Sequence, residues 1–114
     1  MERDAGRERV DIVLGDCRGA SCAPALTERV EKDLIRLGYA VARNNPYSGG
    51  FVTQHYGRPG EEVHALQIEI NRTLYLDEAS LTRGPGFAKL AADMDKLVRA
   101  MGDIAAGLHA AAAE

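Results

Sequence analysis

Apolar and polar positions in the first part of the chain alternate in a way that predicts a strand, a helix and a second strand. Residues 10–14 (VDIVL) predict a short buried strand. Over residues 24–37 the apolar positions recur three and four apart, which is typical of an amphipathic helix. Ser21 is a plausible cap for this helix, and Gly38 is expected to end it in a left-handed conformation. A second strand over residues 39–43 would complete a right-handed parallel crossover.

The rest of the chain carries one more clear strand and one long helix. We expect residues 51–56 to be extended and residues 57–62 (GRPGEE) to form a turn. Residues 63–71 (VHALQIEIN) predict the clearest strand, and residues 72–84 an irregular segment. From about residue 85 to residue 112 an apolar stripe at helical spacing predicts a helix that packs on the sheet. Strands that alternate with helices indicate the α/β class.

Composition and charge narrow the possible functions. The chain has 114 residues, of which 46% are hydrophobic, and this fits one small domain. A formal net charge of −3 without a basic run argues against a nucleic-acid partner. No apolar stretch is long enough for a bilayer, and residues 1–9 lack the apolar core of a signal peptide, so we expect a flexible N-terminus and a cytoplasmic location. Cys17 and Cys22 are then expected to be free thiols.

Glu69 is the residue that most needs an explanation. In a strand over residues 63–71, one face carries Leu66, Ile68 and Ile70, whereas the other becomes polar through Gln67 and Glu69. If the strand is central, Glu69 is at least partly buried, and a buried carboxylate needs a cation, a metal or a chemical task. A solvated strand face, or an ion pair with an arginine, explains the same pattern without a function.

Two loops follow predicted strands, where α/β sheets often place their sites. The loop NNPYSGG (residues 44–50) offers polar groups in Asn45 and Tyr47 and close backbone approach at Gly49 and Gly50, although a plain surface turn would look the same. The loop GDCRGAS (residues 15–21) precedes a helix and could hold an anion, but it lacks the lysine of a phosphate-binding loop. Its aspartate could serve a site or merely cap the loop.

The histidines do not form a zinc motif. None of His55, His64 and His109 has the spacing of a zinc-binding helix. His64 falls on the apolar strand face and is expected to be a hydrogen-bonded core residue, so His55 is the better functional candidate.

Two long segments carry a family resemblance. The stretches NNPYSGGFVTQHYGRP and VHALQIEINRTLYLDE resemble the C-terminal signature of N-formylglutamate amidohydrolases. The earlier segment VLGDCRGASCAPAL resembles that family's strand, loop and helix, which usually reads closer to GDRxGxSC. The similarity runs from Val10 to Leu108.

The resemblance implies an activity and a set of site residues. Such enzymes hydrolyse N-formyl-L-glutamate to formate and L-glutamate in histidine degradation, with zinc or a similar divalent metal. The implied fold is a mixed sheet flanked by helices, like that of zinc carboxypeptidases. Glu69 in IEINR would be the catalytic carboxylate, with Gln67 orienting it and Arg72 binding a substrate carboxylate. The substrate loop would contribute Asn45, Tyr47, Gly49 and Gly50.

The resemblance also implies that something is missing. Family members are longer, and their metal ligands lie before the segment matched here, so no metal ligand is assigned to this chain. Residues 10–114 would be the C-terminal half of the domain, inactive alone, with an open sheet edge that favours self-association or a partner chain. Cys17 and Arg18 stand where the family has arginine and then an aromatic residue, which leaves the substrate open. The other reading is a non-catalytic module that binds a small acidic metabolite.

Overall fold

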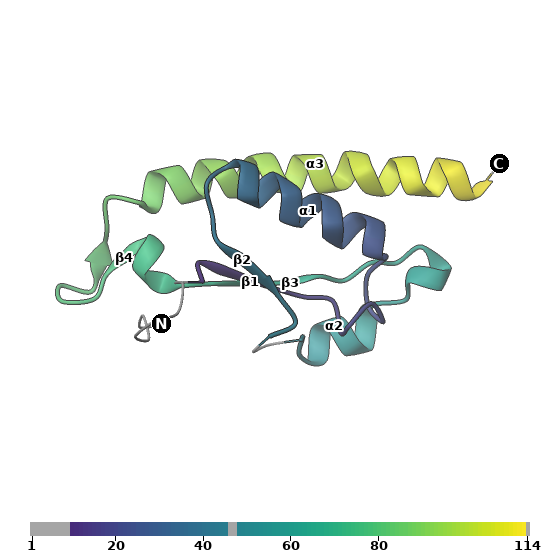
Figure 1. The fold of residues 1–114 in the computed structure, drawn as a ribbon, viewed down its shortest axis with the longest axis horizontal. Helices are drawn as coiled ribbons and strands as arrows, with labels where there is room; N and C mark the ends of the chain where they lie inside the picture. The colour runs from purple at the N-terminus through teal and green to yellow at the C-terminus, as the bar shows by residue number, and fades with distance from the viewer. Residues whose placement is uncertain (1–9, 46–47, 114) are drawn as a thin grey trace.

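The computed structural model describes residues 10–45 and 48–113, so residues 1–9, expected to be flexible, lie outside the described part. Two long helices and a small sheet are arranged in layers (Figure 1). In chain order the elements are β1 (Ile12–Gly15), α1 (Pro24–Arg36), β2 (Val41–Arg43), α2 (Phe51–Tyr56), the 3-10 helix η1 (Pro59–Glu61), β3 (Gln67–Ile70), the 3-10 helix η2 (Arg72–Leu74), β4 (Leu76–Asp77), β5 (Thr82–Arg83) and α3 (Phe87–Ala113).

The main sheet has the strand order β2-β1-β3. β1 and β2 are parallel and joined through α1, which confirms the predicted parallel crossover. β3 runs antiparallel to β1, with Ile12 opposite Ile70 and Gly15 opposite Gln67. The carboxyl end of β3 therefore lies at the amino end of β1, and the sheet is mixed.

Helix α1 begins and ends largely as its sequence predicts. Pro24 occupies its first turn, where its missing N–H is no loss. At its end Gly38 has φ 102°, and the amides of Gly38 and Tyr39 donate to the carbonyls of Ile35 and Leu34. This is a Schellman motif, which confirms the role of the glycine. The predicted cap is wrong, because Ser21 Oγ donates instead to the Ala65 carbonyl at 2.8 Å and α1 has no side-chain cap.

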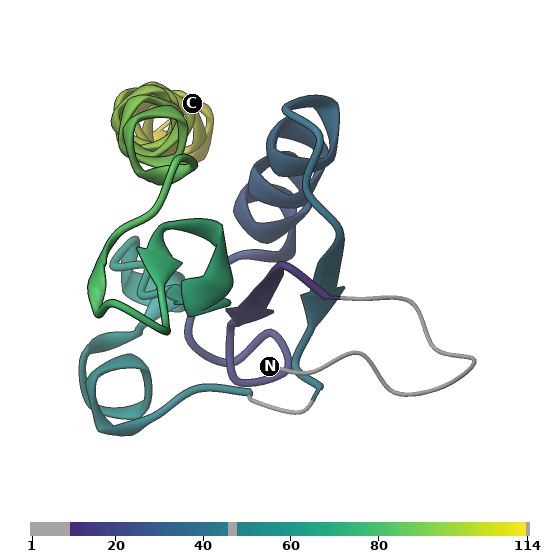
Figure 2. The same ribbon diagram turned by 90° about the vertical axis from the view of Figure 1, so that its left-hand side faces the viewer.

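The hydrophobic core lies between one face of the sheet and the two long helices. α1 and α3 run side by side over this face, α1 above β1 and β2 and α3 towards the β3 side (Figure 2). The stripe of α3 was predicted to pack on the sheet, but much of it packs against α1, and Val98 stays 67% exposed. The buried apolar side chains of this core are Ile12, Leu14, Cys22, Leu26, Val30, Leu34, Tyr39, Leu90 and Leu97.

Two predicted strands differ from the structure. Phe51–Tyr56 is a helix and not extended, because Thr53 is buried and its hydroxyl donates to the Gly50 carbonyl at 2.9 Å. β3 is shorter than predicted, because the segment before it pairs with the loop that leads into α1. In that segment the Ala65 amide donates to the Ser21 carbonyl, and His64 Nδ1 accepts from the Ala23 amide at 3.1 Å. The hydrogen bond to His64 agrees with its predicted structural role.

A polar cluster around the buried Asp93 joins α3 to the end of α1. Tyr39 Oη and Lys89 Nζ both donate to Asp93 Oδ2 at 2.6 Å, and Lys89 also reaches the Leu37 carbonyl at 3.3 Å. The hydrogen bonds from Lys89 and Tyr39 hold the pKa of Asp93 below its ordinary value of 3.8. The lowered pKa means that the carboxylate form is favoured by folding.

Replacing Asp93 by asparagine should therefore change the acid limb of the stability curve. A carboxyl group with a lowered folded pKa stabilises the protein above its unfolded pKa, and this contribution is lost as the pH falls through the folded value. As the pH falls from 5 to below the folded pKa of Asp93, we expect the free energy of unfolding to decrease more for the wild type than for Asp93→Asn. Urea unfolding at several pH values measures this, and parallel curves for the two proteins would show that Asp93 is not linked to folding.

Candidate functional site

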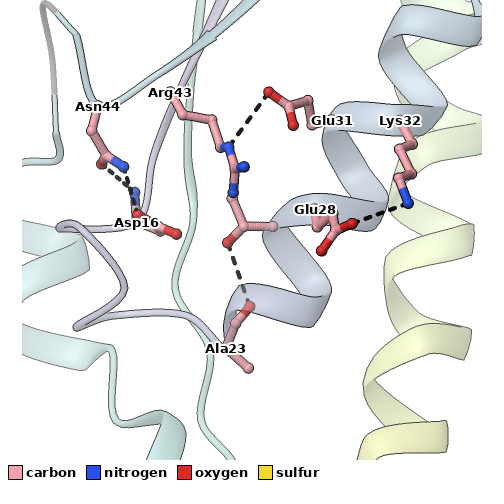
Figure 3. Close-up of polar contacts among 8 residues, drawn as sticks. Asp16, Ala23, Glu28, Glu31, Lys32, Arg43 and Asn44 are labelled. Atoms are coloured by element: carbon pink, nitrogen blue, oxygen red, sulfur yellow. Dashed lines mark hydrogen bonds and ion pairs between the residues drawn. The ribbon is translucent and has the colours of Figure 1, made fainter.

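The carboxyl ends of β1 and β2 meet in a pair of interlocked loops. Asp16 Oδ1 accepts hydrogen bonds from Asn44 Nδ2 at 2.9 Å and from the Gly19 amide at 3.0 Å (Figure 3). In return, Asn44 Oδ1 accepts from the amides of Asp16 and Arg18 at 3.2 and 3.3 Å. Burial acts to raise the pKa of Asp16, but the hydrogen bonds from Asn44 and Gly19 outweigh it and leave the pKa below its ordinary value. Asp16 therefore caps and holds the loop.

Sequence reasoning missed Asn44 as the partner that fixes these loops. Its backbone has φ 57°, in the left-handed region that asparagine tolerates better than most residues. The signal was its position immediately after a strand and beside Asn45 in a run of turn-forming residues. Asn45 itself is exposed, and Tyr47 lies outside the described residues.

Gly49 of the predicted substrate loop lies where a side chain would not fit, whereas a Cβ at Gly50 would make an ordinary contact with Gln67. Gly49 has φ 138°, and a Cβ there would lie 2.5 Å from Thr53 Oγ1 and 2.8 Å from Cys17 Sγ. At Gly50 a Cβ would lie 3.4 Å from Gln67 Oε1. The loop thus passes directly beside the start of β3 and brings Gly50 to Gln67.

Gln67 and Glu69 share one face of β3, opposite the face that packs on α1 and α3. Gln67 Nε2 donates to Glu69 Oε1 at 3.4 Å, and the orienting role of Gln67 stays a prediction. Burial of Glu69 was expected if its strand were central, but among the described residues β3 is an edge strand and Glu69 is exposed, as the alternative of a solvated strand face has it. Gly50, Gln67 and Glu69 therefore form one continuous polar site, which we call the Glu69 site.

Arg72 does not belong to the Glu69 site. Its Nε lies 3.1 Å from Glu78 Oε1, and it follows Asn71, whose amide donates to the Asp11 carbonyl at the amino end of β1. Gly49 and Gly50 lie at the other end of β1. Because β3 runs antiparallel to β1, Arg72 at its carboxyl end lies at the end of the sheet away from the predicted substrate loop.

A hollow of about 430 Å³ lies beside α1 at the carboxyl ends of β1 and β2. It is lined by Arg18 and Arg43 together with Asp16, Gly19, Pro24 and Asn44. Arg43 Nε lies 3.4 Å from Glu31 Oε2, and Arg43 is on the helix-covered face of the sheet, opposite Leu14 (Figure 3). This hollow and the Glu69 site therefore lie on different faces.

His55 and Cys17 contact other side chains of the fold near the site. His55, the favoured histidine, stacks on Phe51 with ring centroids 4.9 Å apart and meets Tyr56 edge-on at 4.6 Å. Cys17 and Cys22 are free, as predicted, and Cys17 Sγ donates to Thr53 Oγ1 at 3.4 Å. Burial raises the pKa of the Cys22 thiol.

The side chains and helices of the described residues bear on metal binding and on membrane spanning. Within residues 10–45 and 48–113, no three side chains of His, Cys, Asp or Glu come together as a metal cage would require. Across the same part of the chain, every helix is too short or too polar to cross a bilayer.

Comparison with known proteins decides the family. The family model for N-formylglutamate amidohydrolase matches residues 1–76. The chain belongs to the N-formylglutamate amidohydrolase family. The residues matched by the family model include the loops at the ends of β1 and β2 and all of the Glu69 site.

Individual relatives agree with this assignment but are much longer. The N-formylglutamate deformylases of Pseudomonas aeruginosa and Pseudomonas putida are 44% and 39% identical over 69 residues, which is 60% of this chain and 26% of each relative. The crystal structure of N-formylglutamate amidohydrolase from Ralstonia eutropha matches with a TM-score of 0.81 and 42% identity. That match covers 91% of this chain and 38% of the solved chain, so the chain spans well under half of its relatives.

Proposed function

We propose that this chain forms part of an enzyme that hydrolyses N-formyl-L-glutamate to formate and L-glutamate. Membership of the N-formylglutamate amidohydrolase family is the observation that carries the proposal. The two Pseudomonas relatives are N-formylglutamate deformylases, and they are similar to this chain over 69 residues. The reaction belongs to histidine degradation, and the cytoplasm is the proposed location, where Cys17 and Cys22 would stay reduced.

In the proposed reaction Glu69 acts as a general base. Its carboxylate takes a proton from the water that attacks the formyl carbon, and the proton passes to the amine nitrogen as the C–N bond breaks. The products are formate and L-glutamate, so atoms and charge balance. Gln67 holds one carboxylate oxygen of Glu69, which limits the orientations of the base. The substrate would lie against Gly49 and Gly50, with Asn45 and Tyr47 as further contacts.

The remaining part of the domain has to supply what this chain lacks. The described residues offer no metal cage, so we propose that a zinc or similar divalent ion of the complete enzyme is held by residues outside them. This chain would then be the C-terminal half of a domain with the zinc carboxypeptidase-like fold. The position of Arg72 does not favour it as the substrate-carboxylate ligand, and that role remains a prediction.

A second candidate function is a module that binds a small acidic metabolite without turnover. The lack of a metal cage among the described residues favours it for the chain by itself. Calorimetry separates the two: we expect neither zinc nor N-formyl-L-glutamate to bind the isolated chain with a Kd below about 1 mM, an affinity of about −4 kcal/mol. Tight substrate binding without zinc would favour the binding module.

The proposed activity is tested with a completed domain. We define this as the present chain co-expressed with the part of the Ralstonia eutropha amidohydrolase that lies outside the matched 38%. We expect the completed domain to release formate and L-glutamate in equal amounts from N-formyl-L-glutamate. Loss of substrate without formate would contradict the proposed reaction.

A further inference from the structure

The outer edge of β3 is an unused row of backbone hydrogen-bonding groups. The Leu14 carbonyl accepts from the Asn44 amide on the β2 side, so the backbone groups of Val13 point the other way, towards β3. Val13 lies opposite Glu69, which directs the backbone groups of Glu69 towards β1. By alternation, the backbone groups of Ile68 and Ile70 face outward. Among the described residues β3 pairs with β1 alone.

An apolar groove lies directly beside this edge. It has a volume of about 420 Å³ and runs between β3 and the first half of α3. Met94 is only partly covered, and Ala91 is exposed on the α3 wall of the groove. The full lining is Ile68, Glu69, Ile70, Tyr75, Phe87, Leu90, Ala91 and Met94. An open strand edge next to an apolar groove is a surface that a further strand and its side chains can complete.

The arrangement of layers shows where the β3 edge lies relative to the two long helices. α3 lies on the β3 side of the molecule, beyond the part of the sheet that α1 covers (Figure 2). The chain superposes on the Ralstonia eutropha amidohydrolase over 91% of its own length but accounts for 38% of that protein. The larger part of that protein therefore lies outside the segment that matches this fold.

We propose that the β3 edge and the groove beside it form the docking surface for the rest of the amidohydrolase domain. The incoming polypeptide adds a strand that pairs with Ile68 and Ile70 and places apolar side chains against Ala91 and Met94. Docking also covers the edge where Glu69 is now exposed, so that the Glu69 site is completed only in the assembled domain. The inference rests on family membership and on this surface, and not on the deformylase activity.

A second copy of this chain fits the same surface less well. In a symmetric antiparallel pair, the register that uses both outward-facing residues sets Ile68 of one copy opposite Ile70 of the other. This register places the two Glu69 side chains directly opposite each other, and like charges in that position are destabilising. Each copy also carries a formal charge of −3.

Ala91→Lys tests the proposal, with Ala92→Lys as its matched control. Both alanines are exposed on α3, but only Ala91 lines the groove. Lysine and alanine are both good helix formers, so neither change should unfold the helix. We expect recovery of the completed domain by co-purification and sizing to fall at least about tenfold for Ala91→Lys, because docking would bury the ammonium group. Ala92→Lys should behave as the wild type does.

Hydrogen exchange gives a second readout. In the chain alone, the amides of Ile68 and Ile70 should exchange faster than that of Glu69, and docking should protect both of them. Equal recovery for the two lysine variants, or no complex with the wild-type chain, would overturn the proposal. So would a dimer of the isolated chain that Ala91→Lys disrupts, because a second copy would then occupy the groove. A complex that forms but releases no formate would instead count against the proposed function alone.

Discussion

Glu69→Gln is expected to lower kcat of the completed domain for N-formyl-L-glutamate by at least about 100-fold. Glutamine keeps the size of the side chain and can still accept a hydrogen bond from Gln67, but it cannot take a proton from water. A positioned general base contributes about 10²–10⁴-fold to the rate, which sets the expected size of the loss. KM should change much less than kcat, because the proton is transferred only in the transition state.

The stability of the variant separates a lost base from a damaged fold. Glu69 is exposed, and among the described residues its side chain accepts a hydrogen bond from Gln67. The free energy of unfolding of the chain should therefore change by less than about 0.5 kcal/mol. Glu28→Gln, at an exposed position of α1, is the control and should keep the wild-type rate. A Glu69→Gln variant with wild-type kcat would mean that another group is the base.

Gly15→Ala is expected to destabilise the chain by about 1–3 kcal/mol, the usual cost of forcing an extra methyl group into a packed site. A Cβ at Gly15 would lie 2.8 Å from the Ser48 carbonyl carbon and 2.9 Å from the Gly49 nitrogen. These are backbone atoms, so the substrate loop has to move as a unit. A loss of this size lowers Tm by roughly 4–8 °C per kcal/mol in a domain near 100 residues.

Gly102 provides a control, because its replacement by alanine should raise the stability of the chain instead of lowering it. Gly102 lies inside α3, and a Cβ there would meet nothing within 4 Å. Gly102→Ala should therefore stabilise the chain by roughly 0.5–1 kcal/mol through its better helix propensity. Thermal unfolding of both variants measures the difference, and a Gly15→Ala variant as stable as the wild type would show that the loop is not held against β1.

Local patterns were enough to predict the first half of the fold. Buried side chains recur at the spacing of a strand over residues 12–14 and of a helix over residues 24–36. β1, α1 and their order therefore follow directly from the sequence. Gly38 was predictable for the same reason, since a left-handed residue is needed where α1 ends. The alternation in β3 correctly separated the core residues Ile68 and Ile70 from Glu69.

Features that depend on contacts between distant segments were not predictable. Phe51–Tyr56 contains aromatic and β-branched residues that favour strands, yet the contacts of Thr53 with the substrate loop hold it as a helix. The direction of β3 is set by the whole topology and not by its sequence, so the separation of Arg72 from the loop at residues 44–50 could not be predicted. The exposure of Glu69 follows from its place on an edge strand, which periodicity does not reveal.

We propose that this chain forms part of an N-formylglutamate deformylase. Formate release from N-formyl-L-glutamate, measured with added zinc for the isolated chain, for the isolated Ralstonia eutropha part and for the completed domain, tests it most directly. We predict release from the completed domain only, and loss of that release in its Glu69→Gln variant. Formate release by the isolated chain, or a stable completed domain that releases none, would contradict the claim.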